Sequence, residues 1–364
     1  MEALGMKQFD DVYSGRRILL TGHTGFKGSW MAAWLAELGA EVTGLGLNPE
    51  SSPDHWSLLN TPALDLRGDI RDAACVRAAF DQSQPEIVFH LAAQALVRRS
   101  YRDPLESWST NVMGTANILE ACRLTPSVQA VVVITTDKVY ANKEWPWGYR
   151  ENDPLGGHDP YSASKAACEL VVESYRKSFC SGTNGPLIAS ARAGNVIGGG
   201  DWSEDRLVPD LVRSITASSP LEIRSPGSTR PWQHVLECLS GYLLLGQHLL
   251  QADKAVATAW NFGPAAQDNR TVAQVLCGLQ KYWPELAWQT TATPQPHEAN
   301  LLYLDCAQAR SRLDWQPVWS LEEGLKMTAD WYRHQASTGQ AITLEQLTQY
   351  VEAASRAGSV WIQA

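Results

Sequence analysis

The sequence lacks long hydrophobic runs, and none of its apolar stretches approaches the roughly 20 residues that a helix needs to cross a bilayer. Its first residues also lack a basic segment followed by an apolar one, so we expect no secretory signal. Cysteine is scarce: there are 7 in 364 residues, and none forms a Cys-x-x-Cys motif. A scattered, odd set of cysteines in apolar sequence is typical of a reducing compartment. We therefore expect a cytoplasmic protein with no cysteine-based metal site.

Positive charge is also in short supply. The chain has 30 Lys and Arg against 39 Asp and Glu, which gives a formal net charge of −9. This balance disfavours a nucleic acid or an anionic membrane as partner, because no basic field offsets phosphate repulsion. It leaves open a phosphorylated small molecule held by a few local arginines. The 44% of hydrophobic residues is typical of a folded globular chain, not of a disordered one.

Short apolar runs alternate with helical stretches over about the first 190 residues. Because parallel strands need crossover helices, this alternation predicts an α/β fold with a doubly wound parallel sheet. The expected strands cover residues 16–21, 40–45, 86–91, 130–135 and 187–192, and the expected helices include 26–38, 104–123 and 162–180.

The pattern changes beyond residue 195. A loop leads to an expected helix over 205–217, and the Ser-, Pro- and Gly-rich segment 218–233 predicts turns with one short strand. A helix over 235–252, a strand at 259–263 and a mainly helical tail over 271–364 follow. We therefore predict a nucleotide-binding domain over residues 1–195 and a smaller, mainly helical substrate-binding lobe over 196–364. The chain is expected to return to the first domain at about 234–263, leaving mainly 196–233 and 264–364 to the second.

A glycine-rich turn follows the first expected strand, in the sequence Thr21-Gly-His-Thr-Gly-Phe-Lys-Gly28. Glycines allow a tight turn and let a pyrophosphate approach the positive end of a helix. This turn is a candidate dinucleotide site, with an ordinary helix-entry loop as the alternative. The acidic residue expected about 20 positions later is missing, since the second strand leads to Asn48, and this leaves NAD and NADP both open. Asp69 is a candidate adenine contact or an exposed loop residue.

Two polar motifs follow further along the chain. Thr136 and Asp137 come directly after the most apolar strand, at the edge of a parallel sheet where ligands bind. Tyr161 and Lys165 are four residues apart and share one face of the expected helix. Because a nearby ammonium lowers the pKa of a phenol, we expect this pair to take a proton from a hydroxyl near neutral pH. Each motif alone also fits turn or surface-helix chemistry, but their combined order indicates an active site.

Together these motifs resemble the extended short-chain dehydrogenase/reductase family, and within it the nucleotide-sugar 4,6-dehydratases. The resemblance covers nearly the whole chain and includes Leu91-Ala-Ala-Gln94, Asn111-Val-Met-Gly-Thr115, Arg192-Ala-Gly-Asn195 and Trp260-Asn-Phe-Gly263. Longer stretches are similar to the branch that acts on CDP-glucose, namely residues 23–30, 147–161, 194–202 and 229–235.

The resemblance implies a Rossmann domain and a lyase reaction with NAD, as used in deoxysugar, O-antigen and lipopolysaccharide biosynthesis. The sugar is oxidised at C4, water is lost across C5 and C6, and the hydride returns to C6. Tyr161 would accept the 4-hydroxyl proton with the help of Lys165, and Thr136 would hydrogen-bond that hydroxyl. Asp137 would protonate the departing 6-hydroxyl. Lys138 stands where the TDP-glucose enzymes have a glutamate base, so it is either the C5 base, with a lowered pKa, or an electrostatic aid to the enolate.

The resemblance also implies binding residues by position. The implied cofactor contacts are Gly22, Gly25, Phe26, Lys27, Gly28, Asp69, Ile70, Leu91, Ala92, Ala93, Thr110, Tyr161, Lys165 and Val196. The implied contacts of the CDP-sugar are Asn195, Arg206, Arg230 and Asn261, where arginine donors would suit a diphosphate.

Several alternatives stay open from the sequence. Another nucleotide-sugar 4,6-dehydratase or an epimerase would share the scaffold, although an epimerase would not need Asp137. A catalytically silent NAD-binding protein would not need the complete set of reactive side chains. We expect no metal, because the histidines have no ligand spacing. The family further implies a homodimer formed by the helices near 104–123 and 162–180.

Overall fold

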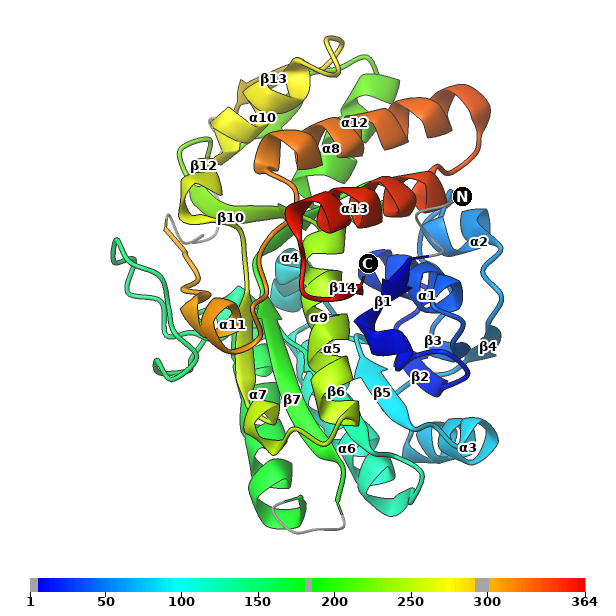
Figure 1. Ribbon diagram of the computed structural model, residues 1–364. Helices are drawn as coiled ribbons and strands as arrows, with labels where there is room; N and C mark the ends of the chain where they lie inside the picture. Colours follow the sequence, from blue (N-terminus) through cyan, green and yellow to red (C-terminus); the bar gives the residue numbers. More distant parts are fainter. Residues whose placement is uncertain (1–5, 181–184, 292–300, 364) are drawn as a thin grey trace.

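The computed structural model describes residues 6–180, 185–291 and 301–363. A seven-stranded sheet forms its centre, with the strand order β11-β7-β6-β5-β2-β3-β4, and every neighbouring pair is parallel. Figure 1 shows the sheet between layers of helices. The strands are β2 (Arg17–Thr21), β3 (Glu41–Gly46), β4 (Leu64–Arg67), β5 (Ile87–His90), β6 (Ala130–Ile134), β7 (Leu187–Ala193) and β11 (Ala259–Phe262).

Helices cover both faces of this sheet, and the strands contribute apolar side chains to both faces. Successive side chains of a strand point to opposite faces, so a strand with helices on both sides must be apolar throughout. In β6, Val132 belongs to one hydrophobic cluster with α1 and α9, whereas Val131 and Val133 belong to a second cluster with α3, α6 and α7. These helices are α1 (Phe26–Glu37), α3 (Ala73–Ser83), α6 (Gly114–Leu124), α7 (Pro160–Phe179) and α9 (Val235–Leu250).

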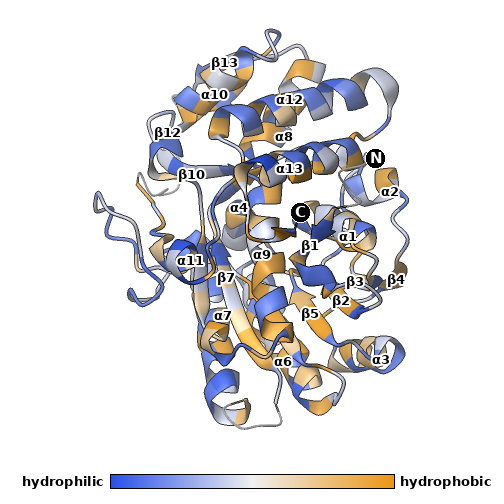
Figure 2. Ribbon diagram, viewed as in Figure 1, coloured by the Kyte–Doolittle hydropathy of each residue, from blue (hydrophilic) through white to orange (hydrophobic). Residues whose placement is uncertain are grey.

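Helix α9 is the most apolar of these helices and is buried along nearly its whole length (Figure 2). Fully burying one leucine side chain contributes about 1.5–3 kcal/mol, so its row of leucines anchors the later half of the chain to the sheet. No helix among the described residues is long and apolar enough to span a membrane.

A second group of elements lies beyond the carboxyl ends of the strands. Its strands form two small sheets, in the orders β12-β10-β8 and β13-β9. Outside this group, β1 and β14 pair and join the two ends of the chain near α9, and α11 packs on β11. The strands are β8 (Asn195–Ile197), β9 (Leu221–Ile223), β10 (Thr229–His234), β12 (Asn269–Thr271), β13 (Trp288–Thr290), β1 (Lys7–Gln8) and β14 (Ile362–Gln363). The helices are α8 (Leu207–Thr216), α10 (Val272–Gln280), α11 (Ala307–Arg312), α12 (Leu321–Thr338) and α13 (Thr343–Ala357).

The α/β class and the parallel sheet are confirmed, and each expected strand of the first 195 residues is present within a residue or two. The sequence analysis missed β4, because this edge strand is half-exposed and carries Asp65 and Arg67, and it missed α3. The single helix expected over 104–123 is divided into α5 (Pro104–Trp108), a π-helical turn (Ser109–Met113) and α6. Two further short helices are α2 (His55–Leu59) and α4 (Val97–Arg102). The division into two domains at residue 195 stays a prediction.

One buried ion pair links α7 to the sheet. The Arg192 guanidinium of β7 lies 3.0 Å from the Glu169 carboxylate of α7, and both side chains are less than 5% exposed. Glu169 also accepts hydrogen bonds from Thr135 (2.5 Å) and Ser190 (2.7 Å). Burial alone would raise the pKa of Glu169, but the Arg192 charge and these hydrogen bonds bring it below its ordinary value. Glu169 is therefore a fully partnered carboxylate that fixes α7 against the end of β6.

We predict that Glu169→Gln lowers the free energy of unfolding by about 3–5 kcal/mol, because it leaves the buried Arg192 charge without a counterion. Glu173→Gln on the same helix is the matched control, since Glu173 pairs with Lys177 at the surface and its loss should cost less than about 1 kcal/mol. Guanidinium denaturation of both variants measures the difference. If both variants lose the same free energy of unfolding, the buried pair contributes no more to stability than the surface pair.

Candidate functional site

A cavity of about 910 Å³ lies at the C-terminal edge of the seven-stranded sheet and extends to α8 and β9. Parallel sheets bind ligands at this edge because the strand ends and the helix N-termini meet there. The cavity brings together nearly all the residues predicted for the site. Those that line it are Gly22, Gly25, Phe26, Lys27, Gly28, Asp69, Ile70, Leu91, Ala92, Ala93, Thr110, Thr136, Asp137, Lys138, Tyr161, Lys165, Asn195, Val196, Arg206 and Arg230.

Asn261 does not line the cavity. Its side chain is fully buried, donates to the carbonyl oxygens of Tyr149 (2.9 Å) and Asp305 (3.1 Å), and accepts from the Tyr140 hydroxyl (2.7 Å). The amide is thus used entirely within the protein. Asn261 therefore joins β11 to two neighbouring loops, and the substrate contact expected of it stays a prediction.

The glycine turn is packed so closely that Gly22 and Gly28 have no room for side chains. Gly22 has φ +75°, and a Cβ there would lie 2.7 Å from the backbone nitrogen of Ala92. A Cβ at Gly28 would lie 2.0 Å from the Gly22 carbonyl oxygen. The turn therefore brings bare backbone to the start of α1, where unpaired N–H groups favour an anion.

The π-helical turn (Ser109–Met113) supports part of the cavity wall. It carries Thr110, which lines the cavity, and Asn111, whose amide is hydrogen-bonded to both backbone groups of Gln94 (2.9 and 3.0 Å). Asn111 also donates to the Ser164 hydroxyl of α7 (2.8 Å). One side chain thus ties the loop after β5 to the helix that carries Tyr161.

Thr136 and Asp137 follow β6 and begin a short 3₁₀ turn (Asp137–Val139). The Thr136 hydroxyl donates to Oδ1 of Asp137 (2.9 Å), whereas Oδ2 of Asp137 is buried and has no partner among the described residues. Burial raises the pKa of Asp137, and the charges of Lys138, Arg230 and Lys27 only partly oppose this. Asp137 is therefore a carboxyl group inclined to keep a proton, with one oxygen free for a ligand.

Tyr161 lies in the first turn of α7, which begins at Pro160 after an Asp159 N-cap. Burial raises the pKa of Tyr161 to about 12, and the hydrogen bond to Thr136 and the charge of Arg206 oppose that rise. The Lys165 ammonium donates to the carbonyl oxygen of Ile134 (3.1 Å). The expected lowering of the tyrosine pKa is thus not found, because burial outweighs the hydrogen bond to Thr136 and the charge of Arg206.

Two arginines extend the site away from these groups. Arg206 precedes α8, lies 3.6 Å from Asp201, and its charge acts on Tyr161. Arg230 lies on β10, is buried, and its charge acts on Asp137. Both arginines are therefore beside the candidate catalytic residues, at the start of the second group of elements.

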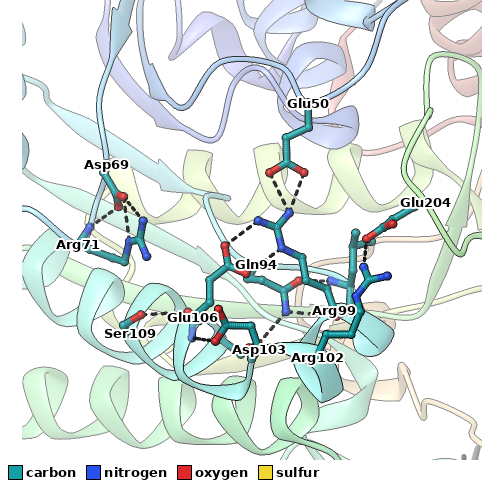
Figure 3. A network of polar contacts seen from close by, with 12 residues as sticks. Glu50, Asp69, Arg71, Gln94, Arg99, Arg102, Asp103, Glu106, Ser109 and Glu204 are labelled. Atoms are coloured by element: carbon teal, nitrogen blue, oxygen red, sulfur yellow. Dashed lines mark hydrogen bonds and ion pairs between the residues drawn. The ribbon is translucent and has the colours of Figure 1, made fainter.

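The cavity rim near α4 is rich in ion pairs (Figure 3). Arg99 lies between Glu50 (2.8 Å) and Glu106 (2.7 Å), and these two carboxylates raise its pKa. Arg102 pairs with Glu204 in the loop before α8. These ion pairs connect α4 to the loop after β3 on one side and to the loop 201–206 on the other.

The sequence analysis missed several charged residues of this site. Asp205 and Arg224 both line the cavity and pair with each other, 19 residues apart in the chain. No spacing rule links them, since the loop before α8 meets β9 only after folding. Across the described ranges, no three His, Cys, Asp or Glu side chains gather as a candidate metal site.

Comparisons with known proteins agree on one family. Residues 19–328 match the family described as GDP-mannose 4,6 dehydratase. The chain is 47% identical over 328 residues to a CDP-glucose 4,6-dehydratase of Salmonella typhimurium, covering 88% of this chain and 91% of that protein. It is 26% identical over 341 residues to a dTDP-glucose 4,6-dehydratase of Xanthomonas campestris, covering 86% and 92%.

Solved structures of similar fold include both dehydratases and epimerases. A dTDP-glucose 4,6-dehydratase from Streptomyces venezuelae, solved with NAD, has a TM-score of 0.74 and 25% identity over 88% of this chain and 98% of that one. A UDP-glucose 4-epimerase from Thermus thermophilus, also solved with NAD, has a TM-score of 0.76 and 26% identity over 87% and 99%.

Proposed function

The chain belongs to the GDP-mannose 4,6 dehydratase family of extended short-chain dehydrogenases/reductases, and from that premise we propose that it converts CDP-glucose to CDP-4-keto-6-deoxyglucose. The observation that carries this proposal is the meeting of Thr136, Asp137, Tyr161 and Lys165 in one cavity wall. Asp137 favours a dehydratase, because removal of the 6-hydroxyl as water needs an acid that epimerisation does not. The 47% identity to a CDP-glucose enzyme, against 26% to a dTDP-glucose enzyme, supports the choice of nucleotide.

The glycine turn suits a dinucleotide such as NAD. The turn leaves no space for a Cβ at Gly22 or Gly28, as the tight turn and close helix packing of a dinucleotide-binding turn require. Bound NAD+ would supply the redox chemistry that the side chains lack, as a hydride acceptor for C4 and, in its reduced form, a hydride donor for C6. The residues that would hold it are the cavity-lining members of the predicted cofactor set, from Gly22 to Val196.

We assign the proton movements to this chain's own residues. Tyr161 accepts the proton of the 4-hydroxyl, and the charge of Arg206 and the hydrogen-bond contact with Thr136 favour the phenolate that forms. Lys165 donates a hydrogen bond to the Ile134 carbonyl oxygen and thereby holds the face of α7 that carries Tyr161 against the end of β6. The C4 ketone then acidifies the C5 proton, and Asp137 gives its proton to the departing 6-hydroxyl, consistent with its raised pKa.

Lys138 is the remaining charged group of this turn. It lines the cavity, is half-buried, and its charge acts on Asp137. It takes the C5 proton as a base or stabilises the enolate by charge. Asn195, Arg206 and Arg230 are proposed to hold the CDP-sugar, since guanidinium donors match a diphosphate. The product would supply enzymes that build deoxysugars such as those of lipopolysaccharide.

Incubation of the protein with CDP-glucose or TDP-glucose, each with and without added NAD+, tests the proposed function by mass spectrometry. We expect loss of one water from CDP-glucose. Water loss from TDP-glucose alone would overturn the choice of nucleotide, an isomer of unchanged mass would indicate an epimerase, and no change in either sugar would contradict both.

The Asp137→Asn variant separates the proposed steps. We predict that oxidation at C4 continues, seen as the absorbance of reduced nicotinamide, whereas water loss falls by about 10²–10⁴-fold because no acid protonates the leaving group. The Tyr161→Phe variant should lose both signals, since it cannot accept the first proton. If Asp137→Asn still loses water at the normal rate, the acid lies elsewhere.

We also propose a homodimer that works in the reducing cytoplasm, in keeping with seven cysteines that are all unpaired. The outer surface of 104–113 exposes Leu105, Trp108 and Met113, and α7 exposes Leu170. Large apolar side chains grouped on one face favour a contact with a second copy. We expect light scattering to give twice the chain mass and Met113→Lys to reduce it. A monomeric wild-type protein would contradict the dimer.

A further inference from the structure

The charged residues that line the cavity come from two different small sheets. Arg230 lies on β10, in the sheet β12-β10-β8, and its charge acts on Asp137 together with those of Lys138 and Lys27. Arg224 follows β9, in the separate sheet β13-β9, and pairs with Asp205 across the same cavity. A nucleotide sugar likewise has two ends, with the reacting sugar at one, the base at the other and the diphosphate between them. If the sugar lies at Tyr161, the base lies toward Asp205 and Arg224.

Asp205 and Arg224 place a carboxylate beside a guanidinium in the part of the cavity next to β9. Arg224 Nη2 lies 3.3 Å from Asp205 Oδ1, and Arg98 of α4 reaches the same oxygen at 3.4 Å. Both contacts use Oδ1, and within the described ranges Oδ2 accepts no hydrogen bond. Asp205 has φ +57°, in the left-handed region, where aspartate is one of the better tolerated residues. The pair thus offers one free acceptor atom next to free N–H donors.

We propose that Asp205 and Arg224 read the cytosine edge of the substrate, an inference that rests on the proposed function. Cytosine presents an N4 amino donor followed by the acceptors N3 and O2. The Asp205 carboxylate accepts from N4, and the Arg224 guanidinium donates to N3 or O2. Uracil and thymine present an O4 acceptor and an N3–H donor instead. Against this pair, O4 would face a carboxylate and N3–H would face a guanidinium, so both bases are rejected.

The same pair is poorly suited to the diphosphate. A carboxylate beside a phosphate is repelled, and Asp205 is bound to the arginine that would have to serve the phosphate. Arg206 and Arg230, which line the same cavity, are already proposed to hold the diphosphate. Leu207 and Leu221, which also line the cavity, supply apolar surface of the kind that the faces of a pyrimidine require.

The test compares CDP-glucose with UDP-glucose, which differ only in the base. We expect the wild-type protein to have a kcat/KM at least about 100-fold higher for CDP-glucose, because a site built for one hydrogen-bond pattern leaves polar groups unpaired with the other. Asp205→Asn and Arg224→Gln should each lower this ratio at least tenfold, since an amide can face either base. Glu204→Gln is the matched control: it removes the adjacent ion pair with Arg102 and should keep the ratio.

The ratio distinguishes base reading from a merely structural role. If both variants lose activity equally with the two sugars, the pair only supports the loop, and the inference fails while the proposed function stands. A wild-type protein without preference would also overturn it. If neither sugar is turned over, the proposed function fails, and calorimetric binding of free CDP and UDP decides the inference alone. Preference for CDP that the two variants abolish would support it, and equal binding would overturn it.

Discussion

The buried pair of Glu169 and Arg192 is the interaction on which the arrangement of the site depends. Glu169 lies one helical turn beyond Lys165 on α7. Its carboxylate accepts hydrogen bonds from Thr135, which follows β6, and from Ser190 and Arg192 of β7. Tyr161 and Lys165 on α7 are thereby held in place relative to Thr136 and Asp137, which follow β6. A buried charge pair is costly to desolvate, and here each polar atom of the carboxylate has a partner, as such a pair requires.

The network continues outward from Arg192. Its guanidinium also donates to the Tyr140 hydroxyl (2.9 Å) and to the carbonyl oxygen of Glu151 (3.0 Å), and Tyr140 in turn donates to Asn261. This explains why Asn261, in a motif shared with the family, lies behind the site and not within it. Hydrogen bonds therefore join the end of β7, Tyr140 after the turn at 137–139, and β11. The proposed substrate contacts Arg206 and Arg230 lie instead before α8 and on β10.

Much of the fold could be predicted because its signals are local. The strands buried on both faces are nearly continuous apolar runs, and the glycine turn is recognisable from its spacing directly after the first of them. The strand β4 was missed because half-exposed residues such as Asp65 and Arg67 give no apolar run. The division of 104–124 by a π-helical turn leaves no clear trace in the sequence, since no proline or glycine interrupts 105–113. Local patterns also placed Tyr161 and Lys165 on one helix face.

What could not be predicted depends on burial and on long-range pairing. The raised pKa of Tyr161 follows from its enclosure by other elements, which no i, i+4 spacing reports. The meetings of Glu169 with Arg192 and of Asp205 with Arg224 require the sheet and α8 to be in place. A motif therefore identifies the reacting groups, whereas their electrostatics and the base-binding end of the cavity need the folded chain.

The most direct test of the account is to follow the C4 hydrogen itself. CDP-glucose labelled with deuterium at C4 would be converted in ordinary water, and the product analysed by NMR and mass spectrometry. We expect a 4-keto-6-deoxy product that carries the deuterium at C6, because oxidation at C4 and reduction at C6 take place in one closed site. Deuterium retained at C4, or exchanged completely with solvent, would contradict a 4,6-dehydration at these residues.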